Sequence, residues 1–154
     1  PFTSFPTTVY PGWLGGVETN MAVSEGVIYV PVNNLCSIYL KQANFTEGSG
    51  LCDFKTAGGE LVALDGATGK VLWNKDVGNQ NYGGATVVND TVVTITFDGK
   101  IQAFNKADGT AVWTKQMPAY ANATPAIADD MIVAGAGFAA GEGQKPAVVA
   151  YKLP

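Results

Sequence analysis

Few residues in this sequence belong to the types that usually carry out chemistry. None of the 154 residues is a histidine, which excludes a Ser-His-Asp triad, a Cys-His pair and an HExxH zinc helix. All nine basic residues are lysines, so the planar guanidinium clamp for phosphates and carboxylates is also absent. The two cysteines, Cys36 and Cys52, match no paired C-x-x-C metal or redox pattern. We expect them to form a structural disulfide or to be two buried thiols.

Two short motifs suggest chemistry that their surroundings do not support. Residues 135–140 (GAGFAA) fit the G-x-G-x-x-A dinucleotide fingerprint. That motif must open a helix, whereas a Gly- and Pro-bearing stretch at 141–146 follows here, so we predict a loop between two strands. Asp129 and Asp130 could suggest a metal pair, but adjacent acids in a hairpin point in different directions. A solvated turn is the expected structure at that pair.

Composition limits the size of the fold and the kind of partner. A chain of 154 residues with 47% hydrophobic content is about one ordinary domain and can bury a sizeable core. Thirteen acidic residues against nine lysines give a net charge of −4, so we expect no nucleic-acid partner. No apolar run approaches the roughly 18 residues that span a bilayer, so we expect no membrane span.

The elements that must position any site are short strands. Nineteen glycines, eight prolines and many short Val/Ile/Thr runs indicate strands between turns, and no segment keeps a helical apolar period for three turns. The clearest hairpin joins 91–97 to 100–105, and Asp98-Gly99 between them predicts a tight primed turn. Pairs at 25–26, 89–90 and 129–130 predict three further hairpins of one common kind.

The chain repeats itself with a period of about 40 residues. Residues 61–73 (LVALDGATGKVLW) recur as 101–113 (IQAFNKADGTAVW), and 148–152 (VVAYK) form a third, partial copy. Four short strands per unit at this period are typical of a β-propeller blade, whose sheet packs against its neighbours. The third unit stops after its third strand, so its outer strand must come from elsewhere.

We therefore predict an all-β fold, a partial β-propeller of about three four-stranded antiparallel blades whose last blade lacks its outer strand. The approximate blades are 19–78, 79–118 and 119–154, after a leading segment at 1–18. Rings typically need four to eight blades. We interpret the chain as a piece that requires further blades, from the same precursor, another chain or a homo-oligomer.

The element A-x-D-x-x-T-G-x-x-x-W is complete in the first copy of the repeat and partial in the second. Its residues are Ala63, Asp65, Thr68, Gly69 and Trp73, then Ala103, Asn105, Gly109 and Trp113. The element resembles the tryptophan-docking repeat of pyrroloquinoline quinone (PQQ) propellers. Physically, the acid and Thr can bond the turn backbone, Gly can take a positive φ, and Trp can bury a large face between blades.

Two further stretches resemble the late blades of quinoprotein (PQQ-dependent) alcohol dehydrogenases: 15–36, and 82–85 at the start of the next blade. The resemblance implies PQQ with Ca²⁺ at the ring centre and a catalytic carboxylate in blades outside this sequence. It implies cofactor contacts for Asn20 and Tyr82. Tyr82 stands where the family often has Trp, and a core Tyr is the alternative. The Trp that usually follows Asn in the family is absent after Asn20.

Two functions follow from these resemblances. One is the C-terminal part of a periplasmic or secreted quinoprotein dehydrogenase, supplying the wall of a PQQ and calcium site and inactive alone. The other is a non-catalytic PQQ-repeat propeller that binds proteins as a scaffold. The absence of a Trp after Asn20, and of Arg and His from the whole sequence, favours this second function.

Overall fold

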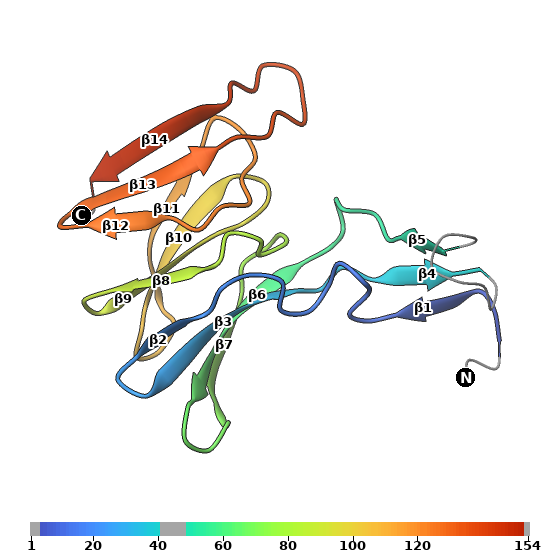
Figure 1. Ribbon diagram of the computed structural model, residues 1–154, viewed down its shortest axis with the longest axis horizontal. Coiled ribbons are helices and arrows are strands. Elements are labelled where there is room, and N and C mark those ends of the chain that lie inside the picture. The colour runs from blue at the N-terminus through green and yellow to red at the C-terminus, as the bar shows by residue number, and fades with distance from the viewer. Residues whose placement is uncertain (1–3, 41–48, 153–154) are drawn as a thin grey trace.

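Runs of alternating Val, Ile, Thr and Ala form antiparallel strands along the chain (Figure 1). A computed structural model describes residues 4–40 and 49–152. These residues contain fourteen strands and no helix, so this part of the chain holds no helix long and apolar enough to cross a membrane. The strands form four sheets of three or four strands each, and the sheets do not close into a ring.

Three of the four sheets are the predicted blades. The first blade is ordered β2 (Ala22–Ser24), β3 (Val27–Asn33), β6 (Gly59–Asp65) and β7 (Val71–Asp76). The second is ordered β8 (Ala85–Val88), β9 (Thr91–Ile95), β10 (Lys100–Asn105) and β11 (Ala111–Gln116). The third contains β12 (Ala126–Ala128), β13 (Met131–Ala136) and β14 (Ala147–Lys152). The predicted fold class is confirmed, including the third blade of three strands.

The fourth sheet was not predicted. It joins β1 (Thr7–Val9), β4 (Ser37–Tyr39) and β5 (Ser49–Leu51), and it projects away from the three blades (Figure 1). β4 and β5 lie in an insertion between β3 and β6, so they have no counterpart in the second blade. A disulfide between Cys36 and Cys52 joins the two ends of this insertion, and the Cys52 amide donates to the Cys36 carbonyl at 3.0 Å. Of the two states that the sequence left open, the cysteines thus form the disulfide.

The three hairpins that connect the first two strands of each blade have loops of the same length. Their first loop residues, Glu25, Asn89 and Asp129, have φ angles of 51°, 49° and 51°. Each loop contains two residues between paired strand ends, as at Ser24 and Val27. A positive φ at the first position is the property of primed turns. The second loop residue differs, because Gly26 also has a positive φ, of 79°, whereas Asp90 and Asp130 do not. The prediction is confirmed for the position and length of the three hairpins but is wrong in giving them one common turn.

The β9–β10 hairpin exists as predicted, but the prediction of a tight primed turn at Asp98-Gly99 is wrong. Phe97, Asp98 and Gly99 form the loop, because the Thr96 amide donates to Lys100 O and the Gly99 amide donates to Thr96 O. Only Gly99 has a positive φ, of 81°, which is typical of a three-residue loop ending in a left-handed glycine. The loop is longer because the Phe97 amide bonds outside the hairpin, to Gln80 O at 2.8 Å.

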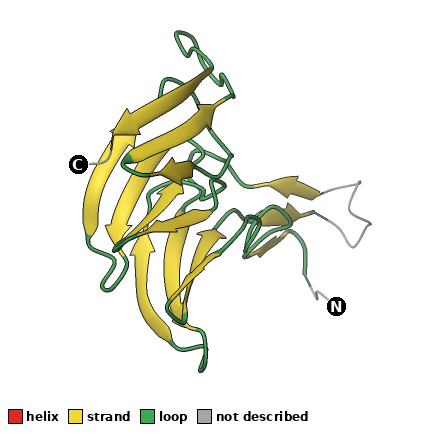
Figure 2. Cartoon of the chain, turned by 60° about the vertical axis from the view of Figure 1, so that its left-hand side comes forward, coloured by secondary structure: helices red, strands yellow, loops and turns green. Residues whose placement is uncertain are grey.

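The three blade sheets lie next to one another (Figure 2), and the buried apolar side chains form two clusters, one between each pair of neighbouring blades. Tyr29, Leu61, Ala63 and Trp73 of the first blade are buried against Val92 and Phe104 of the second. Between the second and third blades, the buried residues include Val93, Ile95, Ile101, Ala103, Ile132 and Ala134. Each blade therefore buries its apolar faces only where a neighbouring blade is present.

Candidate functional site

The repeat element builds a tight turn after the third strand of the first blade. One Asp65 carboxylate oxygen accepts hydrogen bonds from the Thr68 amide at 2.7 Å and the Thr68 hydroxyl at 2.6 Å. Gly69 closes the turn with a φ of 71° and donates its amide to Asp65 O. The hydrogen bonds from Thr68 hold the pKa of Asp65 below its ordinary value. The role of these residues in this structure is to fix the backbone.

The second copy of the turn uses an amide in place of the acid. Asn105 Oδ1 accepts from the Ala107 amide at 2.8 Å, and Gly109 has a φ of 68°. A Cβ atom on Gly109 would lie 2.8 Å from Cε3 of Trp73, so only glycine allows the turn to lie against that indole ring. The second turn thus contacts the tryptophan of the preceding blade.

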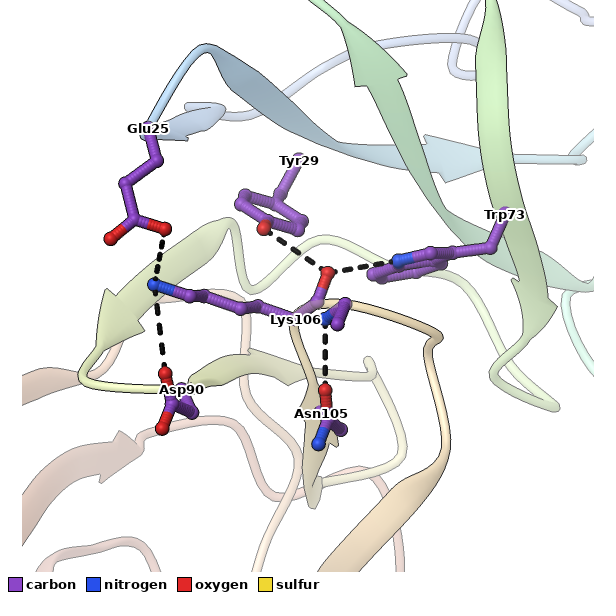
Figure 3. A network of polar contacts seen from close by, with 7 residues as sticks. Glu25, Tyr29, Trp73, Asp90, Asn105 and Lys106 are labelled. Atoms are coloured by element: carbon purple, nitrogen blue, oxygen red, sulfur yellow. Dashed lines mark hydrogen bonds and ion pairs between the residues drawn. The ribbon is translucent and has the colours of Figure 1, made fainter.

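Lys106 links the first two blades through both its carbonyl and its ammonium group (Figure 3). Its carbonyl accepts hydrogen bonds from Nε1 of Trp73 at 3.0 Å and from the hydroxyl of Tyr29 at 3.2 Å. Its Nζ lies 2.9 Å from Glu25 and 3.8 Å from Asp90. The hydrogen bond with Glu25 raises the pKa of Lys106. These contacts join blades, and none of them leaves a group free for chemistry.

Trp113 occupies the corresponding position in the second blade. Its ring packs against the core between the second and third blades and meets Tyr151 edge to face, with centroids 5.9 Å apart. Both repeat tryptophans therefore face the following blade.

The segments that lead into the first strands of the three blades converge at one place. The Ala85 amide donates to Asn20 O at 3.0 Å, which joins the first two blades. The Thr124 hydroxyl donates to Asn20 Oδ1 at 3.1 Å, which reaches the third blade across 104 positions of sequence. Because all three blades meet here, a group bound at this place would be shared among them.

A pocket of about 330 Å³ opens beside this convergence. We call it the Tyr82 pocket, and its lining residues are Leu14, Glu18, Thr19, Phe54, Tyr82, Phe97 and Asn122. The Tyr82 hydroxyl donates to Leu14 O at 2.6 Å, and its ring meets Phe97 edge to face at 5.8 Å. Burial, and secondarily the charge of Glu18, raises the pKa of Tyr82. The hydroxyl is therefore neutral and fixed in direction at physiological pH.

Buried polar groups hold the segment that carries Tyr82. Asn81 is fully buried, and its Nδ2 donates to Glu60 O at 3.0 Å. The Thr94 hydroxyl lies 2.5 Å from Asn81 Oδ1 and 2.6 Å from Gly84 O, so its single proton can serve only one of them at a time. In contrast, the buried hydroxyl of Thr19, in the wall of the pocket, has no hydrogen-bond partner within 4–40 and 49–152.

Of the two residues predicted to contact the cofactor, the structure places only one in the wall of the Tyr82 pocket. Tyr82 lines the pocket, whereas Asn20 is exposed, does not line it, and bonds to Thr124 instead. Phe97 was missed because a hairpin loop residue gives no sequence signal for a ligand. Its ring contacts those of Phe54, Tyr82, Tyr120 and Phe138, with centroids 5.4–6.2 Å apart. An aromatic residue inside a turn, where polar residues are usual, was the available signal.

Among the described residues that line the Tyr82 pocket, Glu18 is the only acidic one and none is a lysine. Across the described ranges, no group of three or more His, Cys, Asp or Glu residues could hold a metal ion. The motif at 135–140 lies in the end of β13 and the loop before β14, as predicted, and opens no helix. Asp130 forms an exposed ion pair with Lys152 at 3.0 Å.

Comparison with known proteins identifies relatives over nearly the whole chain. A family model described as outer membrane protein assembly factor BamB matches residues 11–152. Quinoprotein ethanol dehydrogenase of Pseudomonas putida is 32% identical over 124 residues, covering 72% of this chain and 20% of that protein. Outer membrane protein assembly factor BamB of Nitrosomonas eutropha is 23% identical over 120 residues, covering 78% of this chain and 26% of that protein.

A solved structure shows the same fold. Quinohemoprotein alcohol dehydrogenase ADHIIG from Pseudomonas putida HK5 matches with a TM-score of 0.69 at 18% identity, covering 87% of this chain and 24% of that chain. The present chain thus spans a fifth to a quarter of the length of these relatives. The predicted resemblance to PQQ-type propellers is confirmed.

Proposed function

The chain belongs to the family described as outer membrane protein assembly factor BamB, and we propose that it forms three blades of a larger quinoprotein dehydrogenase-like propeller. In this proposal it supplies one wall of a chamber for PQQ and calcium. The observation that carries the proposal is the Tyr82 pocket, which lies where the three blades converge and presents the rings of Tyr82 and Phe97. The identity to the quinoprotein ethanol dehydrogenase supports it.

The residues of the pocket fit part of such a cofactor. PQQ is a planar fused ring, and Tyr82, Phe97 and Phe54 offer aromatic surface against which such a ring can pack. Its carboxylates need cations, and none of the lining residues that the structure describes is a lysine. Glu18, Thr19, Tyr82 and Asn122 are the described lining residues with side-chain oxygens, whereas Ca²⁺ takes about six to eight oxygen ligands. The remaining ligands therefore belong to other blades in this proposal.

This chain would orient the cofactor and exclude water from one side of it. When bound, PQQ supplies the electron acceptor for alcohol oxidation. Tyr82, held by its bond to Leu14 O, would set the position of the ring, and the unpartnered Thr19 hydroxyl could donate to an oxygen of the ligand. Asn20 would act indirectly, by joining the first and third blades through Thr124. We expect no turnover from this chain alone, because the catalytic carboxylate lies elsewhere in the proposal.

The partners of the chain in this proposal are the remaining blades of the propeller. The repeat tryptophans would dock each blade on the next, as the bond from Trp73 to Lys106 supports. A periplasmic or secreted location is proposed as well, because disulfides persist in oxidising compartments.

The full-length protein tests the proposal directly. It would be incubated with PQQ and CaCl₂, and quinone retention would be measured by ultrafiltration alongside alcohol-dependent dye reduction. We expect Tyr82→Ala to weaken quinone retention and Tyr82→Phe to retain most of it, since the ring is kept. Tyr10→Ala, at a 69% exposed tyrosine, is the matched control. A wild-type protein that neither retains quinone nor reduces the dye would refute the dehydrogenase function.

A second candidate is a protein-binding scaffold without a cofactor. The lack of a cationic side chain among the described lining residues of the Tyr82 pocket favours it, as does the description of the matching family. Cross-linking of the full-length protein to a defined partner, combined with no quinone retention, would support the scaffold. Tight PQQ binding would count against it.

A further inference from the structure

A second pocket, of about 500 Å³, shares the residues Phe54 and Phe97 with the Tyr82 pocket. We call it the Lys55 pocket, and its lining residues include Phe54, Lys55, Gln80, Phe97, Asp98 and Tyr120. They come from the insertion in the first blade, the link between the first two blades, the β9–β10 loop and the segment before β12. The pocket therefore does not depend on the two ends of the blade stack.

The Lys55 pocket contains one cation and one anion that do not pair with each other. Lys55 and Asp98 both line it, yet within residues 4–40 and 49–152 neither takes part in an ion pair. The Thr96 hydroxyl donates to Asp98 Oδ1 at 2.6 Å, and the other carboxylate oxygen accepts no hydrogen bond from these ranges. The ammonium of Lys55 and one oxygen of Asp98 are therefore available to a ligand.

Three aromatic residues supply the apolar part of the pocket. The ring of Phe97 contacts those of Phe54 and Tyr120, with centroids 6.2 and 5.4 Å apart. All three residues are half-buried, so part of their surface is accessible. A ligand with an apolar side chain would remove that surface from water, which is favourable.

Hydrogen bonds hold the walls of the pocket in place. The buried Gln80 side chain donates through Nε2 to Phe54 O, and Gln80 O accepts the Phe97 amide at 2.8 Å. Gln116 Nε2 donates to Asp98 O at 2.7 Å. Because these parts are already ordered, a ligand loses less of its binding free energy to ordering the site.

From these charges and rings we infer that the Lys55 pocket binds a zwitterion, an α-amino acid with an apolar side chain. The carboxylate of the amino acid pairs with the ammonium of Lys55, and its ammonium pairs with the available oxygen of Asp98. Its side chain packs against the three aromatic rings. The volume of the pocket lies within the range of about 300–1,000 Å³ that is typical of small-molecule sites.

Three ligands that differ in their charged groups test the site. The full-length protein would be titrated with L-phenylalanine, with phenethylamine, which lacks the carboxylate, and with 3-phenylpropionate, which lacks the ammonium. By isothermal titration calorimetry we expect saturable binding of one L-phenylalanine at millimolar concentration or below. Each singly charged ligand should bind about tenfold more weakly or worse, because one charge-assisted hydrogen bond is lost. No saturable binding of L-phenylalanine, or equal binding of all three ligands, would overturn the inference.

Two substitutions assign each charge of the ligand to one residue. Lys55→Met should weaken binding of L-phenylalanine by about tenfold and leave that of phenethylamine unchanged, because phenethylamine has no carboxylate. Asp98→Asn should weaken binding of L-phenylalanine but not that of 3-phenylpropionate, which has no ammonium. Lys70→Met, at an exposed lysine outside the pocket, is the matched control. Equal losses for Lys55→Met and Lys70→Met, or a uniform loss for all three ligands in Lys55→Met, would overturn the inference.

Quinone retention separates this site from the proposed quinone chamber. Lys55 and Asp98 do not line the Tyr82 pocket, and Tyr82 does not line the Lys55 pocket. Lys55→Met should therefore lose amino-acid binding and keep the quinone retention of the wild type. Loss of both would indicate one shared site and overturn the inference. Amino-acid binding by a wild-type protein that retains no quinone would support this site and refute only the chamber.

Discussion

At the scale of single residues, Trp73 connects two blades by packing and by one hydrogen bond. Its ring is buried beside Tyr29, and its Nε1 donates to Lys106 O. We expect Trp73→Ala to lower the free energy of unfolding by about 3–5 kcal/mol, since it leaves a large cavity. Trp73→Phe, which loses mainly the hydrogen bond, should cost about 1 kcal/mol from that bond, plus the smaller ring contact. Urea denaturation followed by circular dichroism measures both.

The neighbouring Leu72 provides the matched control for Trp73. It is 51% exposed, so Leu72→Ala should change the free energy of unfolding by no more than about 0.5 kcal/mol. Equal losses for Leu72→Ala and Trp73→Ala would show that the tryptophan has no special part in joining the blades.

Asp65 makes the repeat turn sensitive to acid. Hydrogen bonds from Thr68 lower its pKa, so the folded state favours the charged form. The resulting stability is present above the unfolded pKa of about 3.9 and is lost as the pH falls through the lower folded pKa. Between about pH 5 and pH 2 the urea midpoint of the wild type should therefore fall more steeply than that of Asp65→Asn. Thr68→Ala, which removes the hydroxyl donor, should also flatten the curve, and three parallel curves would contradict this account.

At the scale of elements, the disulfide closes the insertion that carries β4 and β5. Because it joins residues 36 and 52, the model of loop closure gives it about 3 kcal/mol of stabilisation. In the Cys36→Ser/Cys52→Ser chain we expect faster amide exchange in β4 and β5, and unchanged exchange in β9 and β10 of the second blade. Equal acceleration in all four strands would show that the projecting sheet and the blades unfold together.

Local patterns were sufficient to predict the blades but not the projecting sheet. The hairpins at Glu25, Asn89 and Asp129 depend on neighbouring residues, and the repeat of 61–73 at 101–113 revealed the blade as a unit. The insertion between β3 and β6 occurs once, so no repeat marked its strands. The site was less predictable, because the bond between Asn20 and Thr124 spans 104 positions and Phe97 reaches the pocket only through the fold.

At the scale of the whole molecule, both ends of the blade stack expose apolar side chains, which include Val23 at one end and Val133 and Val148 at the other. The second blade covers the first with three side chains, those of Val87, Val92 and Phe104. The third blade has apolar residues at the same paired positions, and they pack against the second blade: Ile127, Ile132 and Tyr151. The same positions in the first blade are Val23, Ile28 and Leu64, and within residues 4–40 and 49–152 no blade lies before them. At the other end, no blade within these ranges follows Val133 and Val148. We therefore expect a second copy of this chain to meet these ends head to tail, through two different faces.

Two single variants test this head-to-tail contact. Val23 is 70% exposed and Val148 is 79% exposed, so Val23→Asp and Val148→Asp should each fold while disabling opposite ends. By sedimentation velocity at micromolar concentration, we expect the wild-type chain to self-associate and each variant alone to be a monomer. An equimolar mixture should form a dimer, because each variant retains the end that the other has lost. A monomeric wild type, or a mixture that stays monomeric, would refute the contact. If the interface instead joined two identical faces, only one of the two variants would abolish it.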